Sequence, residues 1–214
     1  MTRRPNFIFI ITDQQRADHL GCYGNSIVKT PNIDSLAEKG RRFERFHVAN
    51  PICMPNRASI MTGRMSSLHG AVHNGIPLSL DHTTFVELLR DANYQTGLIG
   101  KSHLQSFTGL PATKRFEPEE GLHTPSQELR DAYKANRHSA DYDLEVIPNW
   151  DRPLAERMNG HFYGFDHVEI AADHADQAAG DYLLWARQQD PNFDNLVGPE
   201  NALPDNRINA PQAW

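Results

Sequence analysis

Residues 52–64 read ICMPNRASIMTGR, and this stretch decides how the rest of the chain is interpreted. Pro55 is typical of a first helical turn and Gly63 of a helix end, so a short helix is predicted from Pro55 or Asn56, closed by Gly63. Cys53 stands at the N-terminus of that helix. Unpaired N–H groups there favour an anion, and therefore favour a thiolate over a thiol.

Local sequence leaves two interpretations of Cys53 open. The first is a nucleophile, although an ordinary cysteine nucleophile also needs a histidine base and the neighbouring residues identify none. The second is a small, buried apolar residue, which is the commoner fate of a free thiol. Cys22 and Cys53 are the only cysteines among 214 residues, so no disulfide framework is expected and a reducing compartment is favoured.

Composition indicates a globular protein of one large domain or two small ones. Hydrophobic residues make up 39% and charged residues 22%, which excludes a disordered chain. The net charge of −6 gives no basic footprint for nucleic acid. No apolar run reaches the length of a membrane span, and the run Phe7–Ile11 is too short for a signal peptide. We therefore expect a cytoplasmic protein that binds neither nucleic acid nor membrane.

Strand and helix signals alternate along the first half of the chain. The apolar run Phe7–Ile11 predicts a strand buried on both faces. Residues 30–40 predict a helix with Pro31 at its first position and a glycine at its end. A further helix is predicted over 85–93 and a second buried strand over 94–99. This alternation predicts an α/β fold with a largely parallel sheet flanked by helices.

The pattern weakens in the second half of the chain. Residues 108–151 are rich in charge, proline and histidine, which predicts a long surface excursion. Residues 190–214 show no hydrophobic period, and compact domains seldom end in such a segment. We therefore predict that residues 1–105 form the N-terminal core with the Cys53 motif. Residues 106–214 are predicted to be an insertion and continuation of the same domain, which is incomplete at its C-terminus.

Polar residues follow both predicted strands, at the sheet edge where α/β proteins bind ligands. Asp13 and Gln14 offer hard oxygen atoms to a divalent cation, although an aspartate after a strand more often caps a turn. Lys101 and His103 would point the same way in an extended segment. Such a pair suits binding an anion and protonating a leaving oxygen. The alternative for this pair is a solvated lysine and a polar loop histidine.

Four blocks of sequence, in order, resemble type I sulfatases of the alkaline phosphatase superfamily. Cys53-Met54-Pro55-Asn56-Arg57, continued to Thr62-Gly63-Arg64, is similar to the family signature C-x-P-x-R with its T-G-R ending. The other blocks are PNFIFIITDQQRAD (5–18), TPNIDSLAEKG (30–40) and YQTGLIGKSHL (94–104). Gly164-Phe165-Asp166 also resembles a family segment. The main resemblance covers Pro5 to about Gln105 and implies an alkaline-phosphatase-like fold.

The resemblance also implies catalytic roles. A formylglycine-generating maturation enzyme would oxidise Cys53 to formylglycine, whose hydrated aldehyde is the nucleophile. Pro55 and Arg57 would form part of the maturation signal, and Arg57 would also steady the hydrate. Lys101 and His103 would contact the ester oxygens and the nucleophile.

Metal and substrate ligands are implied as well. Asp13, Gln14 and the modified residue 53 would hold a divalent metal ion, calcium or manganese. Gln14 would also contact substrate, and it stands where many sulfatases have a second aspartate. Asp-Gln variants of this kind resemble the phosphonate monoester hydrolase and phosphodiesterase branch, in which Asn74 would be the substrate-contacting asparagine.

Two other groups have weaker ligand patterns. His69 and His73 are four residues apart, a spacing found in helical zinc pairs, but Gly70 separates them and no third ligand is adjacent. Family members draw further ligands, an aspartate with a neighbouring asparagine or histidine and a lysine, from the second half of a much longer chain. His174 and Asp176 are nearby polar residues without a convincing match to that set.

The sequence thus predicts a metal-dependent hydrolase of sulfate monoesters that uses a formylglycine made from Cys53. Its partners would be a small anionic ester substrate, the maturation enzyme and, as an option, a second copy of itself. One alternative is a phosphonate monoester hydrolase or phosphodiesterase of the same family. Others are an inactive truncated fragment and a cysteine-dependent hydrolase with unmodified Cys53.

Overall fold

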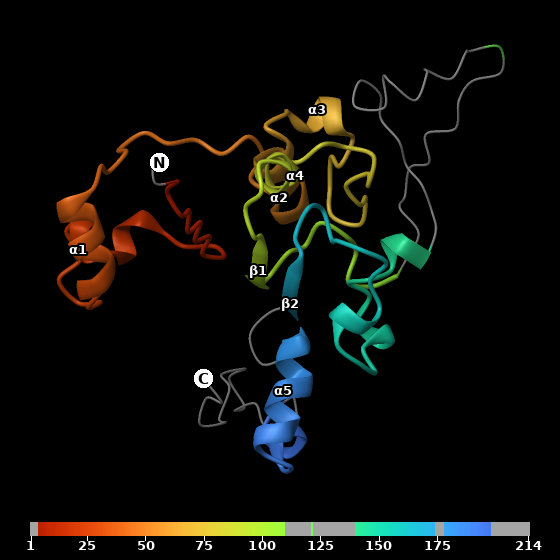
Figure 1. Cartoon of the computed structure of the whole chain (residues 1–214). Coiled ribbons are helices and arrows are strands. Elements are labelled where there is room, and N and C mark those ends of the chain that lie inside the picture. The colour runs from red at the N-terminus through yellow and green to blue at the C-terminus, as the bar shows by residue number, and fades with distance from the viewer. Residues whose placement is uncertain (1–3, 110–120, 122–139, 174–177, 198–214) are drawn as a thin grey trace. The chain divides into compact units, whose positions relative to one another are not determined.

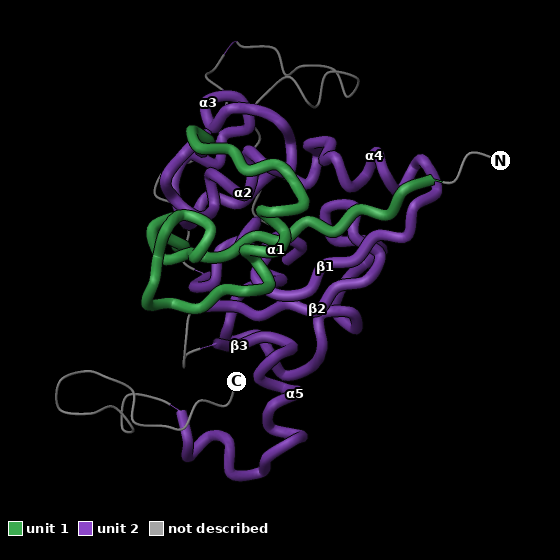
Figure 2. Tube along the Cα trace, turned by 90° about the vertical axis from the view of Figure 1, so that its left-hand side faces the viewer, with its two compact units in different colours: residues 1–47 green, residues 48–214 purple. Residues whose placement is uncertain are grey.

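The computed structural model describes residues 4–109, 121, 140–173 and 178–197. These residues belong to two compact units, unit 1 over residues 1–47 and unit 2 over residues 48–214 (Figure 2). Within the described residues, unit 1 contains helix α1 and two 3₁₀ turns, and unit 2 contains the sheet with helices α2 to α5 (Figure 1). The division predicted from sequence, at residue 105, separates a core from its continuation within one domain. It stays a prediction.

Helix α1 (Pro31–Lys39) confirms the helix predicted over 30–40. Its last turn closes through the N–H of Gly40, which donates to the carbonyl of Leu36 at 2.8 Å. Thr30 lies just before the helix. Its Oγ1 accepts the N–H of Gly21 at 2.8 Å and donates to Asp34 Oδ1 at 3.0 Å. These bonds fasten α1 to the 3₁₀ turn Gly21–Tyr23, which follows the turn Ala17–His19.

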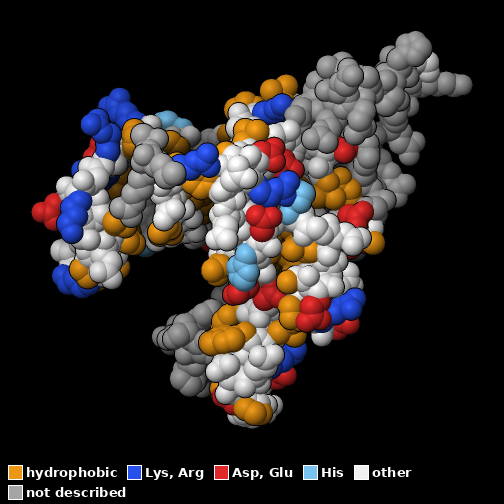
Figure 3. Space-filling model, viewed as in Figure 1, with side chains coloured by type: hydrophobic (Ala, Val, Ile, Leu, Met, Phe, Trp, Pro, Cys, Tyr) orange, Lys and Arg blue, Asp and Glu red, His pale blue; other side chains and the backbone are white. Residues whose placement is uncertain are grey.

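The prediction of a buried strand at Phe7–Ile11 is wrong, because the structure of unit 1 shows no strand there. The five side chains are exposed, from 41% at Ile11 to 87% at Ile8. Apolar and β-branched residues favour an extended backbone, but a strand also needs a neighbour for its N–H and C=O groups. No residue described in unit 1 belongs to a strand. Hydrophobic side chains are consequently visible on the surface of the segment that carries α1 (Figure 3).

The sheet of unit 2 has three short strands in the described part of the chain. Strand β1 (Gly97–Gly100) pairs in parallel with β2 (His167–Ala172), and β2 pairs antiparallel with β3 (Ala179–Gly180). The parallel register places Gly97 beside His167. The predicted α/β fold is therefore confirmed. The described sheet is small and mixed, and β1 is shorter than the strand predicted over 94–99.

Four helices of unit 2 carry clear local signals. Figure 1 shows α2 (Cys53–Thr62), α3 (Ser66–His69) and α4 (Phe85–Asp91) together, with β1 and β2 below them in that view. Helix α4 begins with a reciprocal capping box, in which Thr84 accepts the N–H of Glu87 and the Glu87 carboxylate accepts the N–H of Thr84. Helix α5 (Asp181–Gln189) follows β3 directly.

One hydrophobic core joins these elements. Its buried members are Ala58, Met61, Ala71, Leu78, Val86, Leu104, Phe107, Trp150, Leu154, Phe162, Tyr163, Val168, Ile170, Ala172 and Ala179. Alternate residues of β2 are buried, as expected for a strand that packs on one face. None of the helices in the described residues is both long and apolar enough to cross a bilayer.

Part of the predicted surface excursion is instead interior. Residues 140–151 form two 3₁₀ turns, Ala140–Tyr142 and Ile147–Asn149, and bury Tyr142, Glu145 and Trp150. Two further 3₁₀ turns follow at Leu154–Glu156 and Phe193–Asn195. The prediction is wrong for 140–151 because aromatic residues spaced among charged ones bury their rings without a regular period. Residues 110–120 and 122–139 lie outside the described residues, as does most of 190–214.

Candidate active site

Cys53 is the first residue of α2, so the helix begins two or three residues before the predicted start at Pro55 or Asn56. Ile52 before it is extended, and the ten-residue helix ends at Gly63 in a left-handed conformation with φ of 66°. Pro55 falls in the first turn, where N–H groups have no partner within the helix, so its missing N–H costs nothing. Cys53 is half-buried and lies at the positive end of the helix dipole.

Arg57 links α2 to the segment that follows β1. It comes one helical turn after Cys53 and therefore projects from the same face. Its Nη1 donates to the carbonyl oxygen of Lys101 at 2.6 Å, and only 9% of the residue is exposed. No salt bridge joins Arg57 to a carboxylate in the part of the chain that the structure describes. A buried guanidinium thus stands one turn from Cys53, against the backbone of Lys101.

Lys101 and His103 lie in a turn and not in the extended segment that the sequence suggests. Gly100 ends β1, and His103 has a φ of 52°, in the left-handed region that non-glycine residues seldom adopt. The imidazole is buried and stacks on the ring of Phe107, with centroids 4.0 Å apart and planes within 11°. Lys101 Nζ lies 6.0 Å from the same ring centroid. Both side chains therefore lie near Phe107 despite the turn.

Asn74 lies at the N-terminal end of α2. Its Oδ1 accepts the N–H of Met54 at 3.1 Å, and the N–H of Gly75 points to Met54 Sδ at 3.1 Å. A side chain twenty residues away thus satisfies one of the unpaired N–H groups of the first turn. The structure therefore brings Asn74 next to Cys53. Its predicted contact with substrate stays a prediction.

Glu145 holds the His103 turn from a distant part of the chain. Its carboxylate is fully buried. Oε2 accepts the N–H of His103 at 2.8 Å, and Oε1 accepts the N–H groups of Leu104 and Gln105 at 3.0 Å each. Burial raises the pKa of Glu145 to about 7, and the three N–H donors oppose that rise. Sequence reasoning missed this residue, because nothing local connects it to residues 40 positions earlier.

The raised pKa predicts a pH-dependent stability. Because Glu145 holds its proton more tightly in the folded chain than in the unfolded one, its contribution to stability is complete below pH 4.5 and is lost as pH rises to about 7. Its ionisation then lowers the free energy of unfolding by about 3 kcal/mol. Urea unfolding of Glu145→Gln across this range should lack that fall. Equal pH dependence in both proteins would contradict the prediction.

His69 and His73 do not form a zinc pair. The backbone N–H of Ala71 donates to His69 Nδ1 at 3.2 Å, so the ring proton is on Nε2, which lies 2.9 Å from Ser59 Oγ. Burial, together with the nearby His82, lowers the pKa of His69 to about 4 and keeps the ring neutral. His73 instead places Nδ1 2.7 Å from the carbonyl oxygen of Asn74. His69 therefore braces α2 from inside the core.

The predicted metal ligands are divided between the two units. Asp13 and Gln14 are exposed residues of unit 1, whereas Cys53 belongs to unit 2. Gln14 has a positive φ of 50°. Their oxygens suit calcium or manganese chemically, but calcium takes at least six ligands. No three His, Cys, Asp or Glu side chains gather among the described residues, and 174–177, with His174 and Asp176, lie outside them. The metal site stays a prediction.

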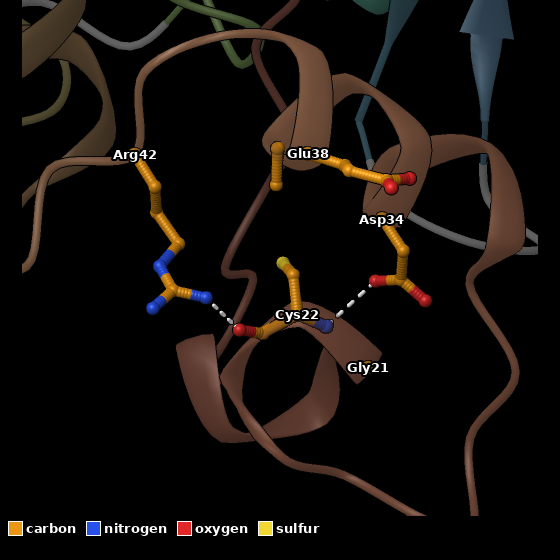
Figure 4. A pocket seen from close by; sticks show the side chains of 6 residues that line it. Gly21, Cys22, Asp34, Glu38 and Arg42 are labelled. Carbon is orange, nitrogen blue, oxygen red and sulfur yellow. Dashed lines mark hydrogen bonds between the residues drawn. The ribbon is translucent and has the colours of Figure 1, made fainter.

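Cys22 occupies a different setting within unit 1. A hollow of about 360 Å³ is lined by Gly21, Cys22, Asp34, Ala37, Glu38 and Arg42 (Figure 4). The N–H of Cys22 donates to Asp34 Oδ1 at 2.7 Å, and Arg42 donates to the Cys22 carbonyl oxygen. In both bonds Cys22 uses its backbone atoms, whereas Asp34 and Arg42 use their side chains. No histidine is among the residues that line the hollow. Cys22 is the only other cysteine of the chain, so it serves as the comparison for Cys53.

Comparison with known proteins decides the family. The sulfatase family model matches residues 5–193. The chain belongs to the sulfatase family. This sulfatase chain is 42% identical over 105 residues to N-acetylglucosamine-6-O-sulfatase of Bacteroides thetaiotaomicron, covering 49% of the chain and 19% of that relative. It is also 42% identical over 114 residues to human steryl-sulfatase, covering 47% and 19%. The chain spans about one fifth of the length of these relatives.

A solved structure supports the fold of the sulfatase chain. The phosphonate monoester hydrolase of Agrobacterium radiobacter aligns with a TM-score of 0.54 at 21% identity, covering 94% of the chain and 32% of that structure. At this identity the likeness concerns the fold alone. The predicted family and alkaline-phosphatase-like fold are therefore confirmed. The catalytic and binding roles of individual residues stay predictions.

Proposed function

We propose that this chain carries the nucleophile end of a metal-dependent sulfatase that hydrolyses sulfate monoesters, with formylglycine made from Cys53. One observation carries the proposal: Cys53 opens α2 while Arg57, one turn later, is buried against the backbone of Lys101. This contact joins the family signature to the block 94–104, which also resembles the family, across 44 residues of sequence.

The charges around Cys53 suit an anionic ester. A buried guanidinium without a paired carboxylate among the described residues is costly, and a bound anion would offset that cost. The N-terminus of α2 and the ammonium of Lys101 add further positive potential. A sulfate monoester carries its negative charge on the group that is attacked. We infer that this cluster receives the sulfate group.

The chain's own residues then have distinct tasks. Arg57 and Lys101 bind the sulfate oxygens and offset the charge that develops on them, and Asn74 orients the group from the first turn of α2. His103 donates its proton to the leaving alcohol oxygen. A formylglycine made from Cys53 would supply, as its hydrate, an oxygen nucleophile at this position. Asp13 and Gln14 would offer oxygen ligands to a divalent cation, and such a cation would supply Lewis acidity.

Sulfate is favoured over phosphonate by the relatives. The two curated relatives described above are sulfatases and share 42% identity with the chain. The phosphonate monoester hydrolase is similar only in fold, at 21% identity. Gln14 alone therefore gives little reason to prefer phosphonate esters. Cytoplasmic location, the maturation enzyme and self-association stay expectations from sequence.

Mass spectrometry and turnover test the proposal together. Co-expression with a formylglycine-generating enzyme should lower the mass of the Cys53 peptide by about 18 Da, because a thiol becomes an aldehyde. The converted protein should hydrolyse 4-nitrophenyl sulfate with a higher kcat/KM than 4-nitrophenyl phenylphosphonate. Faster turnover of the phosphonate ester would favour the alternative branch. Full activity with unmodified Cys53 would refute the formylglycine proposal, and converted protein without turnover would refute the enzymatic one.

A further inference from the structure

We propose that Glu145 is a positioning residue for His103. The buried carboxyl group of Glu145 fixes the turn after β1 and thereby sets the position of the His103 imidazole. This inference rests on the proposed function, because it gives His103 a catalytic task.

The His103 turn cannot satisfy its own backbone. Three consecutive N–H groups, of His103, Leu104 and Gln105, all donate to Glu145, at 2.8 to 3.0 Å. A buried N–H without an acceptor costs free energy, and these residues have left the ladder of β1. Glu145 presents two oxygens to the three N–H groups, which a single carbonyl group cannot do. Glu145 therefore accepts the backbone N–H groups that a neighbouring strand would accept in a sheet.

The contact is reciprocal, which makes it a clamp. Gln105 is also fully buried; its Nε2 donates to the carbonyl of Asp141 at 2.8 Å, and its Oε1 accepts the N–H of Leu144 at 3.0 Å. The N–H of Ile147 further donates to the carbonyl of Phe107 at 2.9 Å. Residues 103–107 and 141–147 thus hold each other by bonds in both directions. We call this pair of segments the Glu145 clamp.

The clamp acts on His103 in particular. The left-handed φ of 52° is unfavourable for histidine and persists only where the surroundings impose it. Glu145 holds the N–H of His103, and Phe107, inside the same clamp, stacks on the imidazole. From the other side, Arg57 holds the carbonyl of Lys101. The turn is therefore fixed at one end by α2, which starts at Cys53, and at the other by Glu145.

Glu145→Gln tests the clamp with little change in volume. Its remaining oxygen can still accept two N–H groups, while its NH₂ group faces the third donor, so the turn should shift without loss of the core. If His103 protonates the leaving oxygen, a shifted imidazole should harm esters of poor leaving groups most. We expect kcat to fall about 10-fold on 4-nitrophenyl sulfate and about 100-fold on phenyl sulfate, with KM changed less than about threefold.

Tyr142→Phe is the matched control. It removes the bond from the N–H of Leu80 to Tyr142 Oη, at 3.0 Å, and so loosens the neighbourhood of residues 141–147 without touching 103–105. A merely structural loss lowers the amount of active enzyme. It therefore lowers the apparent kcat on both esters by the same factor. We expect this pattern for Tyr142→Phe. The same pattern in Glu145→Gln, or unchanged kinetics, would overturn the proposal.

A second measurement separates this inference from the proposed function. Wild-type protein that hydrolyses neither ester would refute the proposed function. In that case the rate of amide hydrogen exchange at His103, Leu104 and Gln105 tests whether Glu145 holds this turn. Faster exchange in Glu145→Gln than in Tyr142→Phe, relative to the rest of the chain, supports it. Equal exchange in the two variants overturns it.

Discussion

Cys53→Ala should abolish sulfate ester hydrolysis, with kcat/KM reduced by at least about 10⁴-fold, the scale expected when a catalytic nucleophile is removed. The reason is chemical, because alanine can neither be converted to formylglycine nor attack an ester. Position 53 is the first residue of α2 and only half-buried, so alanine should change the free energy of unfolding by less than about 1 kcal/mol. Steady-state kinetics and urea unfolding on the same preparation measure both quantities.

Cys22→Ala is the control for this result. Cys22 is half-buried like Cys53, but its two hydrogen bonds use backbone atoms that alanine retains. Activity and the mass change of the Cys53 peptide should both survive the substitution. Two outcomes would contradict the assignment: substantial activity in Cys53→Ala, or equal loss of activity in the two variants. The pair therefore distinguishes a nucleophile from a general sensitivity to the loss of a thiol.

The sequence predicts those features that depend on a few neighbouring residues. Pro31 and Gly40 bound α1, and Pro55 and Gly63 place α2 to within three residues, because these residues act through their own backbone conformation. The signature around Cys53 identifies the family for the same reason, since its residues share the first turn and a half of one helix. Local patterns therefore locate the helix that carries the Cys53 motif well.

Long-range contacts are where sequence reasoning fails. An apolar run such as Phe7–Ile11 shows that burial is favourable, but not which strand supplies its hydrogen bonds. Glu145 is a charged residue that sequence patterns place in solvent, although the structure buries it. A lone glutamate between Leu144 and Val146 normally reads as solvated, and only the fold shows that three N–H groups of a distant turn surround it. A motif can thus suggest candidate catalytic residues, whereas a contact such as that of Glu145 with the distant turn is visible only in the structure.

Asp13→Ala should remove the metal ion and with it most of the activity. Asp13 offers the one full negative charge among the ligands assigned to unit 1, because Gln14 contributes a neutral oxygen. A cation that offsets charge on a sulfate ester supplies several kcal/mol of transition-state stabilisation. We therefore expect kcat/KM to fall by about 10³-fold, equivalent to about 4 kcal/mol. Metal content after dialysis, measured by mass spectrometry of calcium and manganese, should fall in parallel.

Asp18→Ala is the matched control for that substitution. Asp18 is also an exposed aspartate of unit 1, and it pairs with Arg16 at 2.6 Å on the surface. Exposed pairs of this kind contribute little, so metal content and activity should stay at the wild-type level. Retention of the full metal complement by Asp13→Ala would show that the cation is held elsewhere. Loss of metal from both variants would show that it responds to surface charge and not to a ligand at residue 13.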